Sequence, residues 1–337
     1  MILRNQYVLD LFTQIVTLKK KNIIINTLLS LALGCFLLYI VFNKIDLNSF
    51  FSKLSEINYS WIYLSMFISV FEHILRGYRW NLLMQTSKTN LSTYVTTNVM
   101  IVSYFFALFI PRFNDFIRCY LISKTNKIKI STSLGTVVSE RILDLISLFL
   151  ILLIFITLEF DLFYSFLKEH VFINITLNPI NFFWLLLVFL FLFLLIKYFS
   201  KSSKQFREKF AEFKSGLFSV KHIYTNKAFI VSTLLLWFIY FLMGYVIFFS
   251  FNETNTLGVN AGFAVLIAGS IGMIVPVNAG IGAYHFLVAS ILISYNINYE
   301  SGLFFATLLH TSQIICLAIL GVFSSIILFL KIRSNEE

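Results

Sequence analysis

The residues best suited to chemistry in this chain are charged side chains embedded in apolar sequence. Glu72, Arg76 and Arg79 are spaced so that they share one face of a helix, and Glu72 can pair with Arg76 one turn on. A charged side chain at the centre of a bilayer costs at least about 2.5–3.5 kcal/mol on insertion scales, so ionisable residues there are functional candidates by default.

A second charged group consists of Glu140, Arg141 and Asp144, which sit some two turns inside an apolar run. Glu140 and Asp144 are four positions apart on one helix face, with Arg141 near enough to bridge to Asp144. Two interpretations stay open. The group either forms a self-neutralising ion-pair cluster that locks helices together, or Arg141 binds a phosphate with Arg112 and Arg118 while the carboxylates orient the arginines. Arginine suits the second role because its planar fork binds phosphate oxygens bidentately.

Two apolar stretches are interrupted by proline, one at Pro111 and the other at Pro276, and these are two of the three prolines in the chain. Their separation, 276 minus 111, is 165 residues, close to half of the 337. Interrupted hydrophobic segments at matching positions in two halves point to a transporter's substrate site, because a broken helix exposes backbone donors and acceptors within the membrane. The pattern predicts transport through an inverted pseudo-repeat.

The second interruption contains an asparagine and several glycines and is followed by a histidine. Asn278, Gly280 and Gly282 lie in it, and helix amino termini exposed there can donate to an anionic headgroup. His285 follows directly and is a candidate site residue or proton carrier, since the unperturbed pKa of histidine is about 6.5. His310 is typical of a hydrogen-bonded bundle residue and is the weaker site candidate.

The composition places these residues in a membrane. Hydrophobic residues make up 58% of the chain and charged residues 12%, with a mean hydropathy of +0.85. That leaves too little polar surface to solvate a globular domain. The three cysteines show neither metal-ligand spacing nor a disulfide framework. We therefore expect no metal, no cofactor and no nucleic-acid partner.

The apolar runs predict an all-α membrane protein, a polytopic helical bundle over residues 1–337 with about six full spans. About 20 helical residues cross a bilayer core of roughly 30 Å. Two further segments, 94–111 and 259–296, are shorter or interrupted. The expected spans are 23–42, 59–75, 132–158, 180–197, 228–251 and 302–330.

Lys and Arg collect in cytoplasmic loops, which orients the bundle. The basic loop 197–227 is expected to be cytoplasmic, as are both termini, in a bacterial inner membrane. Both ends of 94–111 then face the cytoplasm, so that segment is most simply re-entrant. Residues 259–296 dip in from the outer face, as a re-entrant hairpin or as two broken spans. The amphipathic part of the basic loop either lies on anionic inner-leaflet lipids or links the two halves as a solvated helix.

Four motifs occur in an order that resembles the flippase-like family, also called the lysylphosphatidylglycerol synthase transmembrane-region family. They are RGYRW at 76–80, PRFNDFIRC at 111–119, SERILDL at 139–145 and PVNAGIGAYH at 276–285. The resemblance places Asp115 with Arg112 and Arg118 in one family element, and Glu140, Arg141 and Asp144 in another. The chain departs from the family pattern at Asn114 and Ala279, where glycine is usual, and at His285, where many members carry glutamate.

The resemblance implies a domain that moves a lipid headgroup between leaflets. In aminoacyl-lipid synthases a soluble transferase domain follows it; we expect no such domain here and therefore no synthesis of lysyl-lipid. The leading hypothesis is a flippase for an anionic phospholipid or a polyprenyl-phosphate-linked headgroup. One alternative is an intramembrane glycosyl- or phosphotransferase acting on a lipid carrier. Another is a non-transporting scaffold for envelope-biosynthesis proteins.

Overall fold

The computed structural model describes residues 20–43, 45–85, 91–110, 113–161, 164, 208, 211, 226–275 and 277–334. The expected span 180–197, most of the basic loop 197–227, all three prolines and Arg112 lie outside the described residues.

Every regular element among the described residues is a helix, which confirms the predicted all-α bundle. The elements in chain order are α2 (Lys20–Phe42), α3 (Leu47–Ser52), η1 (Lys53–Ser55), α4 (Tyr59–Gln85), α5 (Thr93–Ala107), α6 (Asn114–Asn126), α7 (Ile130–Leu158), α11 (Lys227–Tyr245), η3 (Val246–Ser250), α12 (Val259–Ile274), η4 (Asn278–Gly280), α13 (Ala283–Ile293) and α14 (Tyr299–Ser334).

Three segments in the described part of the chain are long and apolar enough to cross a membrane: Ile130–Leu158, Lys227–Ser250 and Tyr299–Arg333. The count of six spans stays a prediction. Helix α4 differs from the expected span 59–75 because it continues to Gln85. It can do so because its charges find partners, with Arg76 paired to Glu72 and Arg79 paired to a carboxylate on α7.

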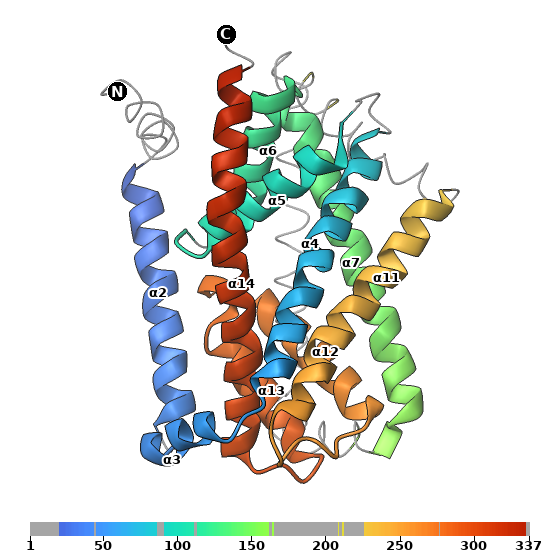
Figure 1. Cartoon of the computed structure of the whole chain (residues 1–337). Coiled ribbons are helices and arrows are strands. Elements are labelled where there is room, and N and C mark those ends of the chain that lie inside the picture. Colours follow the sequence, from blue (N-terminus) through green and yellow to red (C-terminus); the bar gives the residue numbers. More distant parts are fainter. Residues whose placement is uncertain are drawn as a thin grey trace, which may run out of the picture.

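The order of a long helix, a short helical hairpin and a long helix occurs twice. Helices α5 and α6 form a hairpin between α4 and α7, and α12 and α13 form another between α11 and α14 (Figure 1). The first hairpin enters from the end of the bundle where the C-terminus lies, and the second from the opposite end. Helices α4 and α11 run in opposite directions (Figure 1). An inverted arrangement was predicted from the two interrupted segments. The predicted bounds of the first one are wrong, because Leu108 lies at the hairpin tip inside the bundle and α6 makes the return, so 94–111 is not re-entrant by itself.

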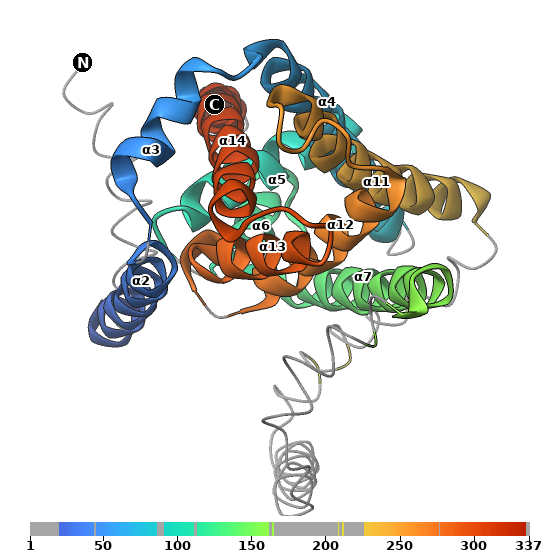
Figure 2. The same ribbon diagram turned by 90° about the horizontal axis from the view of Figure 1, so that it is seen from below.

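The two hairpins lie in the middle of the bundle. Seen from below, α12 and α13 overlap α5 and α6, while α2 lies at the edge of the bundle (Figure 2). The hairpin tips are in contact: the Asn278 Nδ2 atom donates a hydrogen bond of 2.9 Å to the Leu108 carbonyl oxygen. Two half-length elements from opposite ends thus meet inside the bundle.

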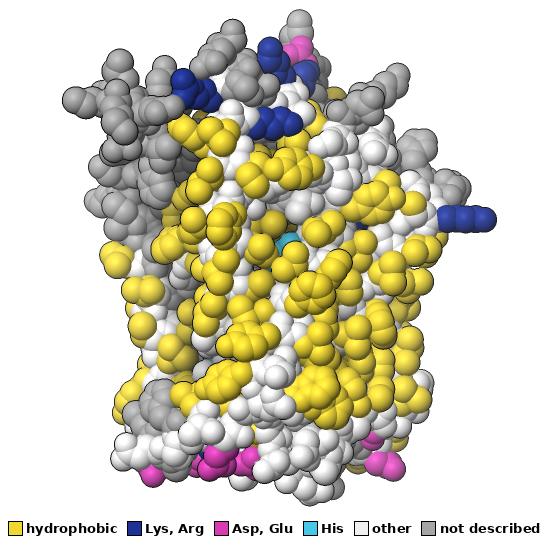
Figure 3. Space-filling model, viewed as in Figure 1, with side chains coloured by type: hydrophobic (Ala, Val, Ile, Leu, Met, Phe, Trp, Pro, Cys, Tyr) yellow, Lys and Arg dark blue, Asp and Glu magenta, His cyan; other side chains and the backbone are white. Residues whose placement is uncertain are grey.

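Side-chain types are segregated along the bundle axis. Hydrophobic side chains cover the middle, Lys and Arg gather at the end with the C-terminus, and Asp and Glu gather mainly at the other end (Figure 3). At the acidic end Lys53 lies 3.7 Å from a Glu253 oxygen and 3.4 Å from a Glu300 oxygen. This distribution is the one expected of a protein whose basic end faces the cytoplasm.

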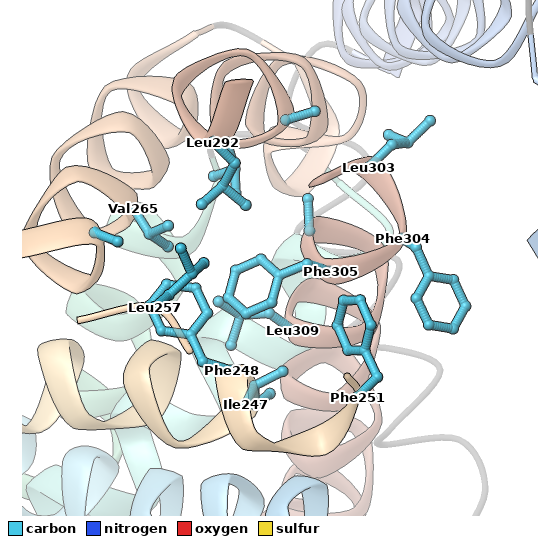
Figure 4. Packing of buried hydrophobic residues seen from close by; sticks show 14 of the residues in the cluster. Ile247, Phe248, Phe251, Leu257, Val265, Leu292, Leu303, Phe304, Phe305 and Leu309 are labelled. Carbon is cyan, nitrogen blue, oxygen red and sulfur yellow. The ribbon is translucent and has the colours of Figure 1, made fainter. Parts of the chain in front are cut away.

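A hydrophobic core fills the acidic end of the bundle. Residues from η3, α12, α13 and α14 meet there, among them the fully buried Phe248 and Phe305 (Figure 4). Their ring centroids are 4.8 Å apart. Burying one such side chain stabilises a fold by about 1.5–3 kcal/mol. The core fixes the second hairpin against α14.

Glycine permits the closest helix approach around the first hairpin. A Cβ atom at Gly77 on α4 would lie 2.6 Å from the Thr97 Cα atom on α5, closer than real Cβ atoms come. Ser92 caps the start of α5, where its hydroxyl accepts a 3.3 Å hydrogen bond from the Val95 amide. The close approach at Gly77 lets α5 pack against α4, and the cap fixes where α5 begins.

Candidate functional site

Helices α4, α6 and α7 bring six of the predicted site residues into one network of ion pairs, here called the arginine cluster. Its members are Arg79, Asp115, Arg118, Glu140, Arg141 and Asp144. Arg112, the other arginine of the predicted phosphate site, lies outside the described residues.

The inner part of the arginine cluster is fully enclosed. Glu140 lies between two arginines, with one oxygen 3.1 Å from Arg79 Nη2 and the other 2.7 Å from Arg118 Nη1. The side chains of these three residues are 2%, 1% and 0% exposed, respectively. Taking a charge out of water costs several kcal/mol, and good geometry with an opposite charge offsets that cost. The inner triad is therefore held together as a unit.

The outer part of the arginine cluster is accessible. Asp144 contacts Arg79 Nη1 at 2.6 Å, and a single Asp115 oxygen lies 3.0 Å from both Arg118 and Arg141. The side chains of Asp144, Asp115 and Arg141 are 28%, 29% and 43% exposed. With the side chains in these positions, the three outer groups are accessible and the inner triad is not.

One predicted contact within this group is wrong. Arg141 was expected to bridge to Asp144, but Asp144 pairs with Arg79 and Arg141 pairs with Asp115. The reason is tertiary, since α4 and α6 supply partners from outside α7. With three arginines and three carboxylates, the arginine cluster is formally neutral. It fits the ion-pair interpretation in its interior and offers a guanidinium for phosphate binding at its edge.

The predicted pair of Glu72 and Arg76 is confirmed, and His73 also contacts Glu72. Arg76 donates a 2.5 Å hydrogen bond to the Tyr240 hydroxyl on α11. Its guanidinium carbon lies 4.7 Å from the centroid of the Tyr104 ring on α5. Arg76 is thereby partnered by its own helix and by two others, so it lies beside the arginine cluster without joining it.

The remaining predicted residues gather at the tip of the second hairpin. The chain turns there through left-handed conformations, with φ angles of 75° at Gly280 and 84° at Gly282. Such angles favour glycine because a Cβ atom crowds the backbone. The Gly282 amide donates to His285 Nδ1 at 3.3 Å, and His310 Nε2 lies 2.9 Å from the Ala279 carbonyl oxygen. The centroids of the two imidazole rings are 5.0 Å apart.

These contacts define what the histidines do locally. Both are buried and each binds the backbone of the hairpin tip, which agrees with the interpretation of His310 as a hydrogen-bonded bundle residue. The role of His285 as a proton carrier stays a prediction. The contact of Asn278 with Leu108 joins this tip to the hairpin that carries Asp115 and Arg118.

A polar seam on α4 was not predicted from the sequence. Ser65 and Ser69 are buried and precede Glu72 on the same helix face. Gln313 on α14 donates a 2.9 Å hydrogen bond to the Ser65 hydroxyl. The signal was present, because positions 65, 69, 72, 76 and 79 follow the alternating spacing of four and three that defines one helix face. The seam leads along α4 from Gln313, one turn beyond His310, toward the arginine cluster.

Comparison with known proteins gives one family. The family model described as "Lysylphosphatidylglycerol synthase TM region" matches residues 27–321. Searches of curated proteins and of solved structures gave no match. The matched range contains both hairpins and the whole arginine cluster.

Proposed function

Because the chain belongs to the lysylphosphatidylglycerol synthase transmembrane-region family, we propose that it moves a phosphate-bearing lipid headgroup between the leaflets of a membrane. The family indicates a lipid-related, flippase-like membrane protein. The finer proposal is that the cargo is an anionic phospholipid or a polyprenyl-phosphate-linked lipid. Its headgroup would enter the bundle while its acyl chains stay in the bilayer.

The observation that carries this proposal is that Arg141 is accessible next to the buried ion pairs of Glu140 with Arg79 and Arg118. Arg141 is 43% exposed, and its Nη2 atom binds Asp115, a carboxylate that is itself accessible. A guanidinium so placed can exchange a carboxylate for a phosphate oxygen without exposing the buried triad. The two hairpins support a path as well, because irregular backbone at membrane depth is tolerated where it is enclosed by protein or lines a cavity.

The state of the carboxylates favours transport over catalysis. A general base must take up a proton, and a neighbouring guanidinium disfavours the protonation of a carboxylate. Glu140 is held by two arginines, and Asp115 and Asp144 are each bound by at least one. We therefore propose a transporter that makes no lysyl-lipid. The distribution of Lys and Arg supports an orientation with the basic end of the bundle and both termini in the cytoplasm.

The test is the transfer of fluorescent phospholipids and polyprenyl-phosphate analogues between leaflets in proteoliposomes. Arg141→Gln removes the accessible guanidinium. Lys124→Gln removes one positive charge from an exposed residue in the last turn of α6 and is the matched control. We expect the unsubstituted protein and Lys124→Gln to accelerate transfer and Arg141→Gln to lose most of the acceleration.

Two results would overturn the proposal. Transfer no faster than in empty vesicles for every lipid tested would exclude the transport of those lipids. Normal transfer by a folded Arg141→Gln protein would remove Arg141 from the path. In the first case the enzyme and scaffold alternatives would lead, and charge reversal in the basic loop 197–227 would test the scaffold.

A further inference from the structure

The Asp115 carboxylate occupies a built anion site. Its Oδ1 atom accepts hydrogen bonds from Arg141 Nη2 at 3.0 Å and Asn114 Nδ2 at 3.1 Å. Arg118 Nη2 lies 3.0 Å from the same oxygen as an ion pair without hydrogen-bond geometry. Two guanidinium groups and an amide around one oxygen is an arrangement that suits a phosphate oxygen as well as a carboxylate oxygen.

The surroundings of this site distinguish it from an ordinary surface ion pair. Arg118 is fully buried, and its Nε and Nη2 atoms have no hydrogen-bond partner among the residues that the structure describes. Buried donors are normally satisfied, so an unused buried N–H marks a place where a further acceptor can bind. Asp115 and Arg141 are accessible, which gives an anion a way in.

We propose that Asp115 is an internal competitor for the phosphate group, which binds Arg118, Arg141 and Asn114 only after the Asp115 side chain swings out. This inference rests on the proposed function for the identity of the carrier, a lipid, but the anion exchange itself does not. Asp115 closes the site in most of the molecules. The apparent affinity for phosphate is then the intrinsic affinity multiplied by the fraction of molecules in the open state. Asp115 thereby sets how tightly the headgroup is held and allows it to be released.

Asp144 provides a matched control for this proposal. It carries the same charge and its side chain is 28% exposed, against 29% for Asp115. Its partner is Arg79, on the far side of Glu140 from Arg118. Removing the charge of Asp144 changes the net charge of the arginine cluster equally but leaves the anion site closed.

The experiment measures binding to purified full-length protein in nanodiscs, with inorganic phosphate in one arm and phosphatidic acid in the other. We expect Asp115→Asn to tighten phosphatidic acid binding by about tenfold, since one closed state is removed. Asp144→Asn should change it by less than about threefold, as expected for a change in net charge at a partly screened position. Equal effects of the two substitutions, or no tightening in a folded Asp115→Asn protein, would overturn the proposal.

A second measurement uses the unsubstituted protein and so does not depend on how a variant folds. A carboxyl-selective diazo reagent is applied while phosphatidic acid is added, and labelling is read by peptide mass spectrometry. Labelling should rise at Asp115 and stay constant at Asp144. Constant labelling at Asp115 while lipid binds would overturn the proposal.

The outcomes also separate this proposal from the proposed function. Tightening by Asp115→Asn for inorganic phosphate but for no lipid would keep the anion exchange and overturn lipid transport. If the unsubstituted protein accelerates lipid transfer but Asp115→Asn changes the affinity for neither phosphate nor phosphatidic acid, the transport proposal stands and the exchange proposal is overturned.

Discussion

Neutralising Glu140 should destabilise the protein far more than neutralising its sequence neighbour Arg141. Glu140 is the anion between Arg79 and Arg118, whose side chains are 1% and 0% exposed. Glu140→Gln keeps the shape of the side chain but leaves these cations short of one negative charge. Breaking a buried ion pair by removing one partner typically costs 3–5 kcal/mol, because the remaining charge is buried without compensation.

The structure adjusts this magnitude in both directions. Arg79 keeps Asp144 at 2.6 Å and Arg118 keeps Asp115 at 3.0 Å, so neither guanidinium loses all of its compensation. Both guanidiniums are affected at once, however. We therefore expect a loss of about 3 kcal/mol in the free energy of unfolding, at the lower end of the range for a buried pair.

Arg141→Gln is the matched comparison. The Arg141 side chain is 43% exposed, and an ion pair of that kind contributes about 0–1 kcal/mol. Unfolding in mixed detergent and lipid micelles, followed by circular dichroism, should give two clearly separated curves. Comparable stability of the two variants would refute the division of the arginine cluster into a sealed interior and an accessible edge. Combined with the lipid-transfer assay, the expected pattern is a stability defect at position 140 and a transfer defect at position 141.

Three further predictions concern glycines. Gly77→Ala should destabilise the fold by about 1–3 kcal/mol, because its Cβ would meet the backbone of Thr97 and force α4 from α5. Gly34→Ala, with nothing within 4 Å of the added Cβ, should be neutral or raise the thermal transition. Gly282→Ala should cost about 1–3 kcal/mol, because the residue has a φ of 84° and its Cβ would press on Leu37 of α2. Thermal unfolding compared across the three variants checks these, and a Gly77→Ala protein as stable as Gly34→Ala would contradict the close packing of α4 on α5.

The helical class and the candidate charges could be predicted because both depend on local pattern. Long apolar runs indicate helices, and charges within them are rare enough to single out. The partners could not be predicted, since Arg79 and Glu140 are 61 positions apart and meet only when α4 packs on α7. The expected bridge from Arg141 to Asp144 failed for the same reason. Spacing along one helix does not reveal competitors on the next.

The hairpins were predicted in outline from a different kind of pattern. Glycine and proline marked where helices break, and the distribution of Lys and Arg indicated the end from which each segment enters. The contact between Asn278 and Leu108 had no such signal, because the two residues are 170 positions apart and the acceptor is a backbone carbonyl. Ser65 and Ser69 were missed although their spacing was visible, because hydroxyls in an apolar helix were not weighed as part of a charged face.

The inverted arrangement of the fold is not matched by an inverted arrangement of charge. The separation of 165 between Pro111 and Pro276 pairs Asp115 with Gly280 and Arg118 with Ala283. The first hairpin thus carries two members of the arginine cluster, whereas the corresponding positions of the second hairpin carry no charge. A headgroup phosphate would be held by guanidinium groups in one half of the bundle, whereas the described residues at the tip of the other offer backbone groups, an amide and two histidines. Because such unequal binding gives the headgroup different energies in the two halves, release toward the second half requires that the hold of Arg118 and Arg141 be weakened. A tethered carboxylate that returns to the same three side chains supplies that weakening at the place where it is needed.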